Sequence, residues 1–371
     1  MLSGLALAGA VLAPLAPAHA DGLETEFDKT FVARPVQPAA MPSPSPQLQS
    51  PQMPAPRIQQ QAAQLPAQTT KRTPPASVRP YVSNRTQRSY SGALGVQVGG
   101  LAEDSQGRIG VAAIDLTTGQ TLSVLGDTPF PLASTSKIAI AATFLDGVDN
   151  GRFSLDARYP LMVPVKSQRF SGFAAPVRPG AMLTGRQLIE RSLIHSDNQA
   201  TDALLAVIGG PAAVNRWIRT TGITGFRLDR DIATLVRDDG EYNPAQMIDE
   251  RDSATPMAMA QLLSGLYQGR WLSASSRSFL LGTMERCETG KRRLRGQLPG
   301  DARVAHKTGT LNNTASDVGI VRAPDGHVYA VAIYVTGQGG HAGRDAKIAL
   351  ISRAIYDGYI GPSGSYASAQ R

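Results

Sequence analysis

Strand-like patterns occur at two widely separated places in this chain, and their separation limits the folds open to it. Residues 108–116 and 121–125 flank a Thr-Thr-Gly-Gln turn and predict a β-hairpin. Residues 315–321 and 328–335 are rich in β-branched residues and flank a Pro-Asp-Gly turn, which predicts a second hairpin. Because helical patterns fill the sequence between them, we expect one antiparallel sheet assembled from both chain ends.

Helical spacing of apolar residues recurs in several segments. These segments are residues 94–101, 184–195, 198–209, 256–268 and 343–359. We therefore predict an α+β fold in which helices flank the sheet and an all-α domain is inserted into it. The catalytic domain spans residues 91–361: its α/β part covers about 91–131 and 286–361, and its α part about 132–285.

The two ends of the chain differ from this central part. Residues 1–20 contain an apolar run and an Ala-His-Ala cleavage pattern, which predict a secretory signal peptide. Residues 21–90 are rich in Pro, Gln, Ser and Ala without apolar periodicity, so we expect a disordered linker there, and residues 362–371 as a disordered tail. We expect a mature protein that begins at Asp21, is periplasmic or secreted, and has no transmembrane segment.

Charge and cysteine content argue against several classes of partner. The net charge is +8, but residues 21–90 hold eight Lys/Arg against four Asp/Glu, so half of the excess lies in the linker. The rest is spread thinly without a basic stripe interleaved with aromatic residues, which argues against nucleic-acid binding. Cys287 is the only cysteine, so we expect a small buried apolar residue and no internal disulfide. One cysteine and five histidines also argue against a metal site, and we expect a monomer.

The segment Ser134-Thr135-Ser136-Lys137 lies at the start of a predicted helix. An apolar run follows it directly, which places Ser134 at the helix N-terminus. Residues three apart share one face of a helix, so Lys137 would stand beside Ser134 and could take its proton. A helix-capping role for the serine is the alternative.

The segment Ser196-Asp197-Asn198 lies at a break between two predicted helices. Ser196 could relay a proton between a lysine and a leaving group, and Asn198 could donate its amide to a substrate carbonyl. The alternative is that these side chains cap the next helix.

The segment Lys307-Thr308-Gly309-Thr310 follows a strand predicted over residues 302–306. Gly309 would leave room for a substrate along the strand edge, while Lys307 and Thr308 could hold an anionic group. The alternative is an edge strand with a solvated lysine. Together the three segments supply a serine nucleophile, two lysines, a bridging serine and an amide, which are the parts of an acyl-transfer site.

The three segments resemble the S-x-x-K, S-D-N and K-T-G motifs of class A β-lactamases and penicillin-binding proteins. Further similarity lies in Arg108-Ile109-Gly110-Val111, Phe130-Pro131, Asp249-Glu250-Arg251-Asp252 with Thr255-Pro256, and Leu298-Pro299. The resemblance extends over about residues 91–360 and implies a β-lactamase-like fold. It implies that Ser134 is acylated, that the backbone N–H groups of Ser134 and Thr310 form the oxyanion hole, and that no metal or organic cofactor is needed.

The loop that carries the deacylating glutamate in class A enzymes departs from their pattern here. Counting back from Asp252 places Asn243 at the asparagine of that loop and Asp239 at the glutamate. Glu241 lies two positions away, so both acids are candidate bases, and the alternative is that both are solvated loop charges. The sequence does not identify an arginine for the substrate carboxylate.

The leading hypothesis is therefore a serine β-lactamase. Its catalytic residues would be Ser134, Lys137, Ser196, and Asp239 or Glu241. Asn198 and the Lys307–Thr310 segment would bind a small β-lactam or a peptidoglycan-like substrate. A penicillin-interacting D,D-peptidase-like hydrolase and a non-catalytic envelope-binding module are the alternatives.

Overall fold

The structure, a computed structural model, describes residues 74–82, 92–103 and 106–360. The predicted signal peptide, most of the predicted linker and the predicted tail lie outside these residues. The described residues belong to one compact unit.

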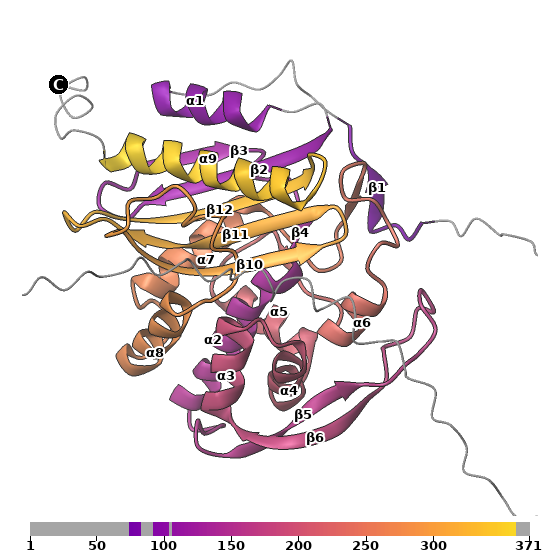
Figure 1. The fold of residues 1–371 in the computed structure, drawn as a ribbon. Coiled ribbons are helices and arrows are strands. Elements are labelled where there is room, and N and C mark those ends of the chain that lie inside the picture. Colours follow the sequence, from indigo (N-terminus) through magenta and orange to yellow (C-terminus); the bar gives the residue numbers. More distant parts are fainter. Residues whose placement is uncertain (1–73, 83–91, 104–105, 361–371) are drawn as a thin grey trace, which may run out of the picture. The chain divides into compact units, whose positions relative to one another are not determined.

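A five-stranded antiparallel sheet forms the centre of the unit, with strand order β10-β11-β12-β2-β3 (Figure 1). Its strands are β2 (Gly107–Asp115), β3 (Thr121–Val124), β10 (Arg303–Leu311), β11 (Thr314–Arg322) and β12 (Val328–Gly337). Strands β2 and β12 pair directly, with Ala112 opposite Ala332. This pairing confirms that the sheet is assembled from both ends of the domain.

Helices cover both faces of this sheet. Helices α1 (Gly92–Ala102) and α9 (His341–Ile360) lie on one face, and α7 (Pro256–Tyr267) packs on the other. Successive side chains of a strand point to opposite faces, so Val331 belongs to one core and Ala332 to the other. Strand β12 is buried along its whole length, which explains its nearly continuous apolar sequence.

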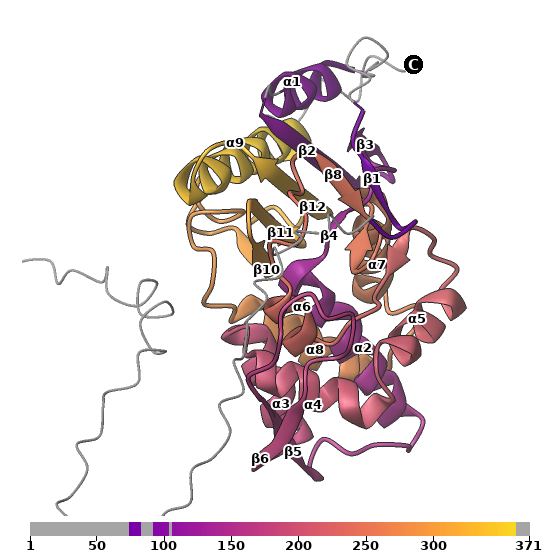
Figure 2. The same cartoon turned by 90° about the vertical axis from the view of Figure 1, so that its right-hand side faces the viewer.

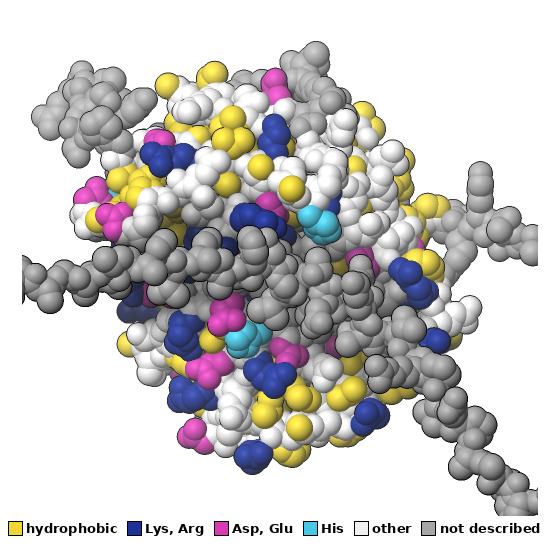
Figure 3. Space-filling model, viewed as in Figure 1, with side chains coloured by type: hydrophobic (Ala, Val, Ile, Leu, Met, Phe, Trp, Pro, Cys, Tyr) yellow, Lys and Arg dark blue, Asp and Glu magenta, His cyan; other side chains and the backbone are white. Residues whose placement is uncertain are grey.

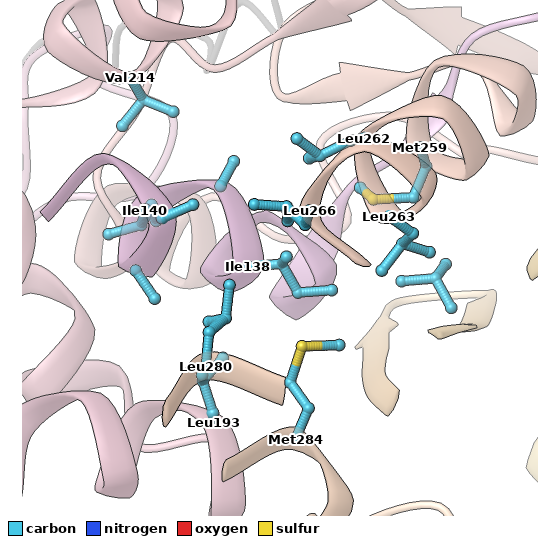
Figure 4. Close-up of a cluster of buried hydrophobic side chains, with 14 of the residues drawn as sticks. Ile138, Ile140, Leu193, Val214, Met259, Leu262, Leu263, Leu266, Leu280 and Met284 are labelled. Atoms are coloured by element: carbon cyan, nitrogen blue, oxygen red, sulfur yellow. The ribbon is translucent and has the colours of Figure 1, made fainter. Parts of the chain in front are cut away.

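The segment between β3 and β10 is mainly helical. Its other helices are α2 (Ser136–Asp149), α3 (Gly185–Ile194), α4 (Asn198–Ile208), α5 (Pro211–Thr220), α6 (Ile232–Arg237) and α8 (Ala274–Glu285). Helix α2 lies at the centre, where Ile138 and Ile140 are surrounded by apolar side chains of the neighbouring helices (Figure 4). The same core continues onto the sheet through residues such as Ala332, so the helical segment and the sheet share one core.

Short strands also occur in this helical segment, and the sequence analysis did not predict them. Strands β5 (Arg158–Pro164) and β6 (Val177–Thr184) form a hairpin that extends along the helices. Three shorter strands, β4 (Phe130–Pro131), β7 (Phe226–Arg227) and β9 (Ser253–Ala254), form a small sheet with β9 in the middle. The inserted segment is therefore helical for the most part rather than throughout.

The prediction of disorder for residues 21–90 is wrong at residues 74–82. Strand β1 (Val78–Pro80) pairs antiparallel with β8 (Met247–Asp249), and the two lie side by side in Figure 2. Backbone bonds extend the pairing, because Glu250 N–H donates to Ser77 O and Tyr81 N–H to Gln246 O. The sequence could not reveal this strand, since it is held by backbone pairing with a distant segment and not by an apolar pattern.

Two properties relate to the predicted partners: the distribution of charged side chains on the surface, and the length and apolarity of the helices. On the face shown in Figure 3, Lys and Arg side chains lie among Asp and Glu side chains rather than in one continuous patch. Among residues 74–82, 92–103 and 106–360, no helix is both long enough and apolar enough to cross a bilayer.

Candidate active site

Ser134 lies in a short 3₁₀ turn, η3 (Ala133–Thr135), that leads directly into α2. Ala133 has a positive φ of 46°, a conformation that costs a non-glycine residue energy and that clusters at functional sites. Hydroxyl groups on either side of Ser134 fix the turn, because Thr135 Oγ1 donates to Leu132 O (2.6 Å) and Ser136 Oγ to Ala133 O (2.8 Å). Ser134 itself remains partly exposed at the end of a buried helix.

Lys137 lies in the first turn of α2, and its side chain is fully buried. Its Nζ donates to Ser196 O (2.5 Å), Ser196 Oγ (3.1 Å) and Asn198 Oδ1 (2.7 Å). Two of the predicted segments are thus joined through one ammonium group. These three hydrogen bonds of Lys137 Nζ are directed to Ser196 and Asn198 and not to Ser134 Oγ.

The Ser196-Asp197-Asn198 segment forms the connection between α3 and α4. Ser196 has a positive φ of 61°, which turns the chain sharply before α4 begins. Asp197 caps α4 by accepting Ala200 N–H (3.0 Å), and Arg191 Nε donates to the same carboxylate (2.8 Å). The capping role belongs to Asp197, which leaves the side chains of Ser196 and Asn198 to meet Lys137.

Strand β10 brings the third segment to the same place. Lys307 is buried, and its Nζ donates to Ser196 Oγ (3.0 Å) and Thr308 O (2.9 Å). Gly309 allows β10 to approach the turn that carries the serine, because a Cβ there would lie 3.0 Å from Leu132 O and 2.5 Å from Ser316 Oγ. Strand β10 is longer than the predicted strand 302–306 and includes the whole Lys-Thr-Gly-Thr segment.

Ser196 Oγ therefore lies between two buried lysine amines. Burial, and next the positive charge of Lys307, lower the pKa of Lys137 well below its ordinary value, while Asp197 and Asp202 oppose this. Burial also lowers the pKa of Lys307 to about 8. Both amines therefore hold their protons less tightly than an ordinary lysine, which suits them to proton transfer.

Arg293 is a site residue that the sequence analysis missed. It is buried behind β10, where Nη1 donates to Gly309 O (3.0 Å) and Nη2 to Thr310 Oγ1 (2.8 Å). Its Nε pairs with Asp345 of α9 at 2.7 Å. No sequence signal could have found it, because it lies in a basic run and its partners come from three other elements.

The two candidate bases, Asp239 and Glu241, lie in the loop between α6 and β8. Both carboxylate oxygens of Asp239 accept Asn312 N–H (3.0 and 2.9 Å), and burial raises the pKa of Asp239. Glu241 pairs with Arg251 at 3.0 Å. Both acids line one pocket, together with Leu311. The structure thus joins Lys137, Ser196, Asn198 and Lys307 by hydrogen bonds, but records no bond from either acid to this group.

Asp202 is a second residue that the sequence analysis missed. It lies one turn after Asn198 on α4, is buried, and accepts the N–H groups of Ile232 (2.7 Å) and Ala233 (2.8 Å). Burial raises its pKa to about 7. Arg230 lies just before α6, and its Nε donates to Asp252, which follows β8, at 2.5 Å. Asp202 therefore links the N-terminus of α6 to the helix that carries Asn198.

Comparisons with known proteins agree with this fold. The model of the β-lactamase enzyme family matches residues 94–359, and the chain belongs to that family. β-Lactamase SME-1 of Serratia marcescens is 31% identical over 249 residues, which cover 66% of this chain and 82% of that protein.

Solved structures are similar over the same region. A β-lactamase from Chitinophaga pinensis shares 31% identity with a TM-score of 0.62, covering 72% of this chain and 99% of its own. An ancestral class A β-lactamase shares 35% identity with the same TM-score, covering 72% of this chain and 100% of its own. These structures confirm the predicted α+β, β-lactamase-like fold.

Proposed function

We propose that this protein is a serine β-lactamase that hydrolyses the β-lactam amide through an acyl-enzyme on Ser134. The observation that carries the proposal is the pair of buried lysines that share Ser196 Oγ, next to a 3₁₀ turn that carries the partly exposed Ser134 and leads into α2. Membership of the β-lactamase enzyme family supports the same chemistry. The relatives and solved structures described above are named β-lactamases.

Acylation begins when Ser134 Oγ attacks the lactam carbonyl carbon. As the neutral amine, Lys137 has a lone pair that accepts the serine proton, so one of the three hydrogen bonds that Nζ donates in the structure has to be released for this step. Ser196 donates a proton to the leaving nitrogen, and Lys307 replenishes it through their 3.0 Å bond. The backbone N–H groups of Ser134 and Thr310 stabilise the oxyanion.

The cationic side of the site suits an anionic substrate group. We propose that Lys307 and Thr308 bind the substrate carboxylate, and that Arg293 supports this contact by orienting Thr310 Oγ1. The site needs no organic cofactor for this chemistry, and no group of His, Cys, Asp and Glu suited to hold a metal occurs in the described part of the chain.

Deacylation requires a carboxylate that activates water, and we propose Asp239 or Glu241 for this step. The bonds of both acids to other partners favour slow turnover, because one of them has to reach a water near the ester. The same observation supports a second candidate function, a penicillin-interacting D,D-peptidase-like hydrolase that acylates readily and releases the acyl group slowly.

We also propose that the protein is exported and acts as a monomer.

Intact-protein mass spectrometry after exposure to penicillin tests the proposal. Wild type should gain the mass of the drug, and Ser134→Ala should gain nothing. Ser136→Ala is the matched control, because its hydroxyl is directed to Ala133 O and should not be acylated. An adduct that persists in Ser134→Ala would contradict the assignment of the nucleophile.

A further inference from the structure

The segment that follows α8 contacts two parts of the active site. Glu288 N–H donates to the carbonyl oxygen of Ile194, the last residue of α3 (3.1 Å). One residue later, Thr289 Oγ1 lies 2.6 Å from Thr308 Oγ1 of β10. Residues 288–290 therefore connect the end of α3, just before Ser196, to the strand that carries Lys307.

The side chain of Thr308 is held at both of its ends by this segment. A Cβ on Gly290 would lie 2.3 Å from Thr308 Cγ2, so the glycine packs directly against the threonine methyl group. Gly290 has a positive φ of 66°, which glycine adopts without strain. Because the hydroxyl meets Thr289 and the methyl meets Gly290, Thr308 is held in one rotamer.

Thr308 also lies beside the ammonium group of Lys307. Their side chains leave the strand on opposite faces, but Lys307 Nζ donates to Thr308 O at 2.9 Å. Strand β10 is an edge strand of the sheet, and only 5% of Thr308 is exposed. An anionic group bound by Lys307 can thus meet only a small part of Thr308, and the direction of the hydroxyl hydrogen decides whether that contact is a hydrogen bond.

The hydrogen bonds of these polar groups have one direction when a carboxylate binds. A hydroxyl has one hydrogen and a carboxylate oxygen only accepts, so Thr308 has to give its hydrogen to the carboxylate. Thr289 is then the donor in the bond between the two hydroxyls. The thiol of Cys287, which is buried as the sequence predicts, lies 3.3 Å from Thr289 Oγ1 and can donate to it.

We propose that Thr289 is a positioning residue: its hydroxyl donates to Thr308 Oγ1 and so turns the hydrogen of Thr308 toward the substrate carboxylate. The inference rests on the proposed function, in which Lys307 and Thr308 bind that carboxylate. Loss of the Thr289 hydroxyl should weaken this contact without slowing the attack by Ser134. An ester in place of the carboxylate carries no charge and accepts a weaker hydrogen bond, so its binding should depend on Thr289 much less.

Three variants of the full chain test this role. Thr289→Val removes the hydroxyl and keeps the shape, and Thr289→Ser keeps the hydroxyl. Thr143→Val is the matched control, because it makes the same change at a hydroxyl that donates to Ala139 O within α2 (2.8 Å). Stopped-flow acylation by a penicillin and by its methyl ester measures two quantities for each variant, the dissociation constant of the first complex and the rate of acylation within it.

Thr289→Val should raise the dissociation constant of the penicillin about fivefold, the loss expected for one hydrogen bond, while the acylation rate and the dissociation constant of the ester stay within about twofold of wild type. Thr289→Ser and Thr143→Val should match wild type with both compounds. If Thr289→Val weakens the binding of both compounds equally, or of neither, the proposal is wrong. If Thr289→Val does not fold, Thr289→Ala, which also lacks the hydroxyl, replaces it.

A second measurement separates this role from the proposed function. Ser134→Ala can bind a penicillin without being acylated, and calorimetry compares its affinity with that of Ser134→Ala combined with Thr289→Val. If the second change weakens binding but wild type forms no acyl-enzyme, the proposed function fails and the role of Thr289 stands. If wild type is acylated and the second change has no effect, the role of Thr289 alone is contradicted. Absence of any binding overturns both.

Discussion

At the scale of single residues, the shared acceptor Ser196 Oγ organises the site. It accepts hydrogen bonds from Lys137 and Lys307, so the amines of the two lysines share one hydroxyl acceptor. The left-handed backbone at Ser196 costs on the order of 1–3 kcal/mol, and the two lysine bonds help to offset it. A single serine thus couples the protonation states of both lysines.

Deacylation is also decided by single side chains. Asp239→Asn should trap the acyl-enzyme, because the amide oxygen can still accept Asn312 N–H while the group can no longer take a proton from water. We expect turnover to fall on the order of 100-fold or more, with acylation changed little. Stopped-flow acylation and steady-state hydrolysis of one cephalosporin measure the two steps.

Glu241→Gln is the matched comparison for this prediction. If it abolishes turnover while Asp239→Asn does not, Glu241 is the base. If neither change affects turnover, no loop carboxylate acts in this step, and the D,D-peptidase-like function becomes the better account.

At the scale of elements, β1 fastens the loop that carries both acids. Arg79 and Ile248 form a hydrogen-bonded pair of the antiparallel ladder, since the pairs two residues to either side do so. The buried Arg108 adds to this by donating to Pro244 O (3.1 Å) and stacking on Tyr81, with its guanidinium 5.2 Å from the ring centre. The loop is thereby held by a segment about 170 residues earlier in the chain.

Arg79→Pro should loosen this loop. Proline removes the N–H at position 79, and one lost hydrogen bond of about 1 kcal/mol raises local opening about fivefold. Hydrogen exchange at Ile248 and Glu250 should quicken accordingly, and turnover should fall more than acylation.

Arg79→Ala provides the control for this change. It keeps the N–H and removes only an exposed 3.5 Å ion pair with Glu250, which is worth little. Equal exchange rates in Arg79→Ala and Arg79→Pro would mean that β1 does not restrain the loop.

At the scale of the whole molecule, the apolar core crosses from the helices to the sheet. Leu263 of α7 belongs to a cluster that includes both Ile138 of α2 and Ala332 of β12. A part of the molecule that shares its core with another part does not unfold alone. The helical segment and the sheet should therefore unfold in one transition.

Leu263→Ala tests this, with an expected loss of about 2–5 kcal/mol in the free energy of unfolding. Urea unfolding is followed by circular dichroism and by tryptophan fluorescence, because Trp217 and Trp271 both lie in the helical segment. The midpoints of the two signals should coincide in wild type and shift together in the variant. Midpoints that separate would show that the two parts unfold independently.

Sequence patterns predicted the elements whose stability depends on their own apolar spacing. Strand β12 and helix α4 are of this kind, and so is the start of α2 just after Ser134. The patterns could not predict features that depend on a distant partner. Arg293 meets Thr310 and Asp345 only after folding, and β1 has no apolar period of its own.

The position of β1 has a mechanical consequence. This strand is the described part of the chain through which any load applied at the N-terminus reaches the folded unit. It is three residues long and bonded to the loop, whereas the C-terminal side ends in the 20-residue helix α9, which is packed on the sheet. Tension from the N-terminal side would therefore act first on the loop and its chemistry, and tension from the other end on the sheet. A protein attached to a support by its first residues should lose turnover under force before it loses its fold.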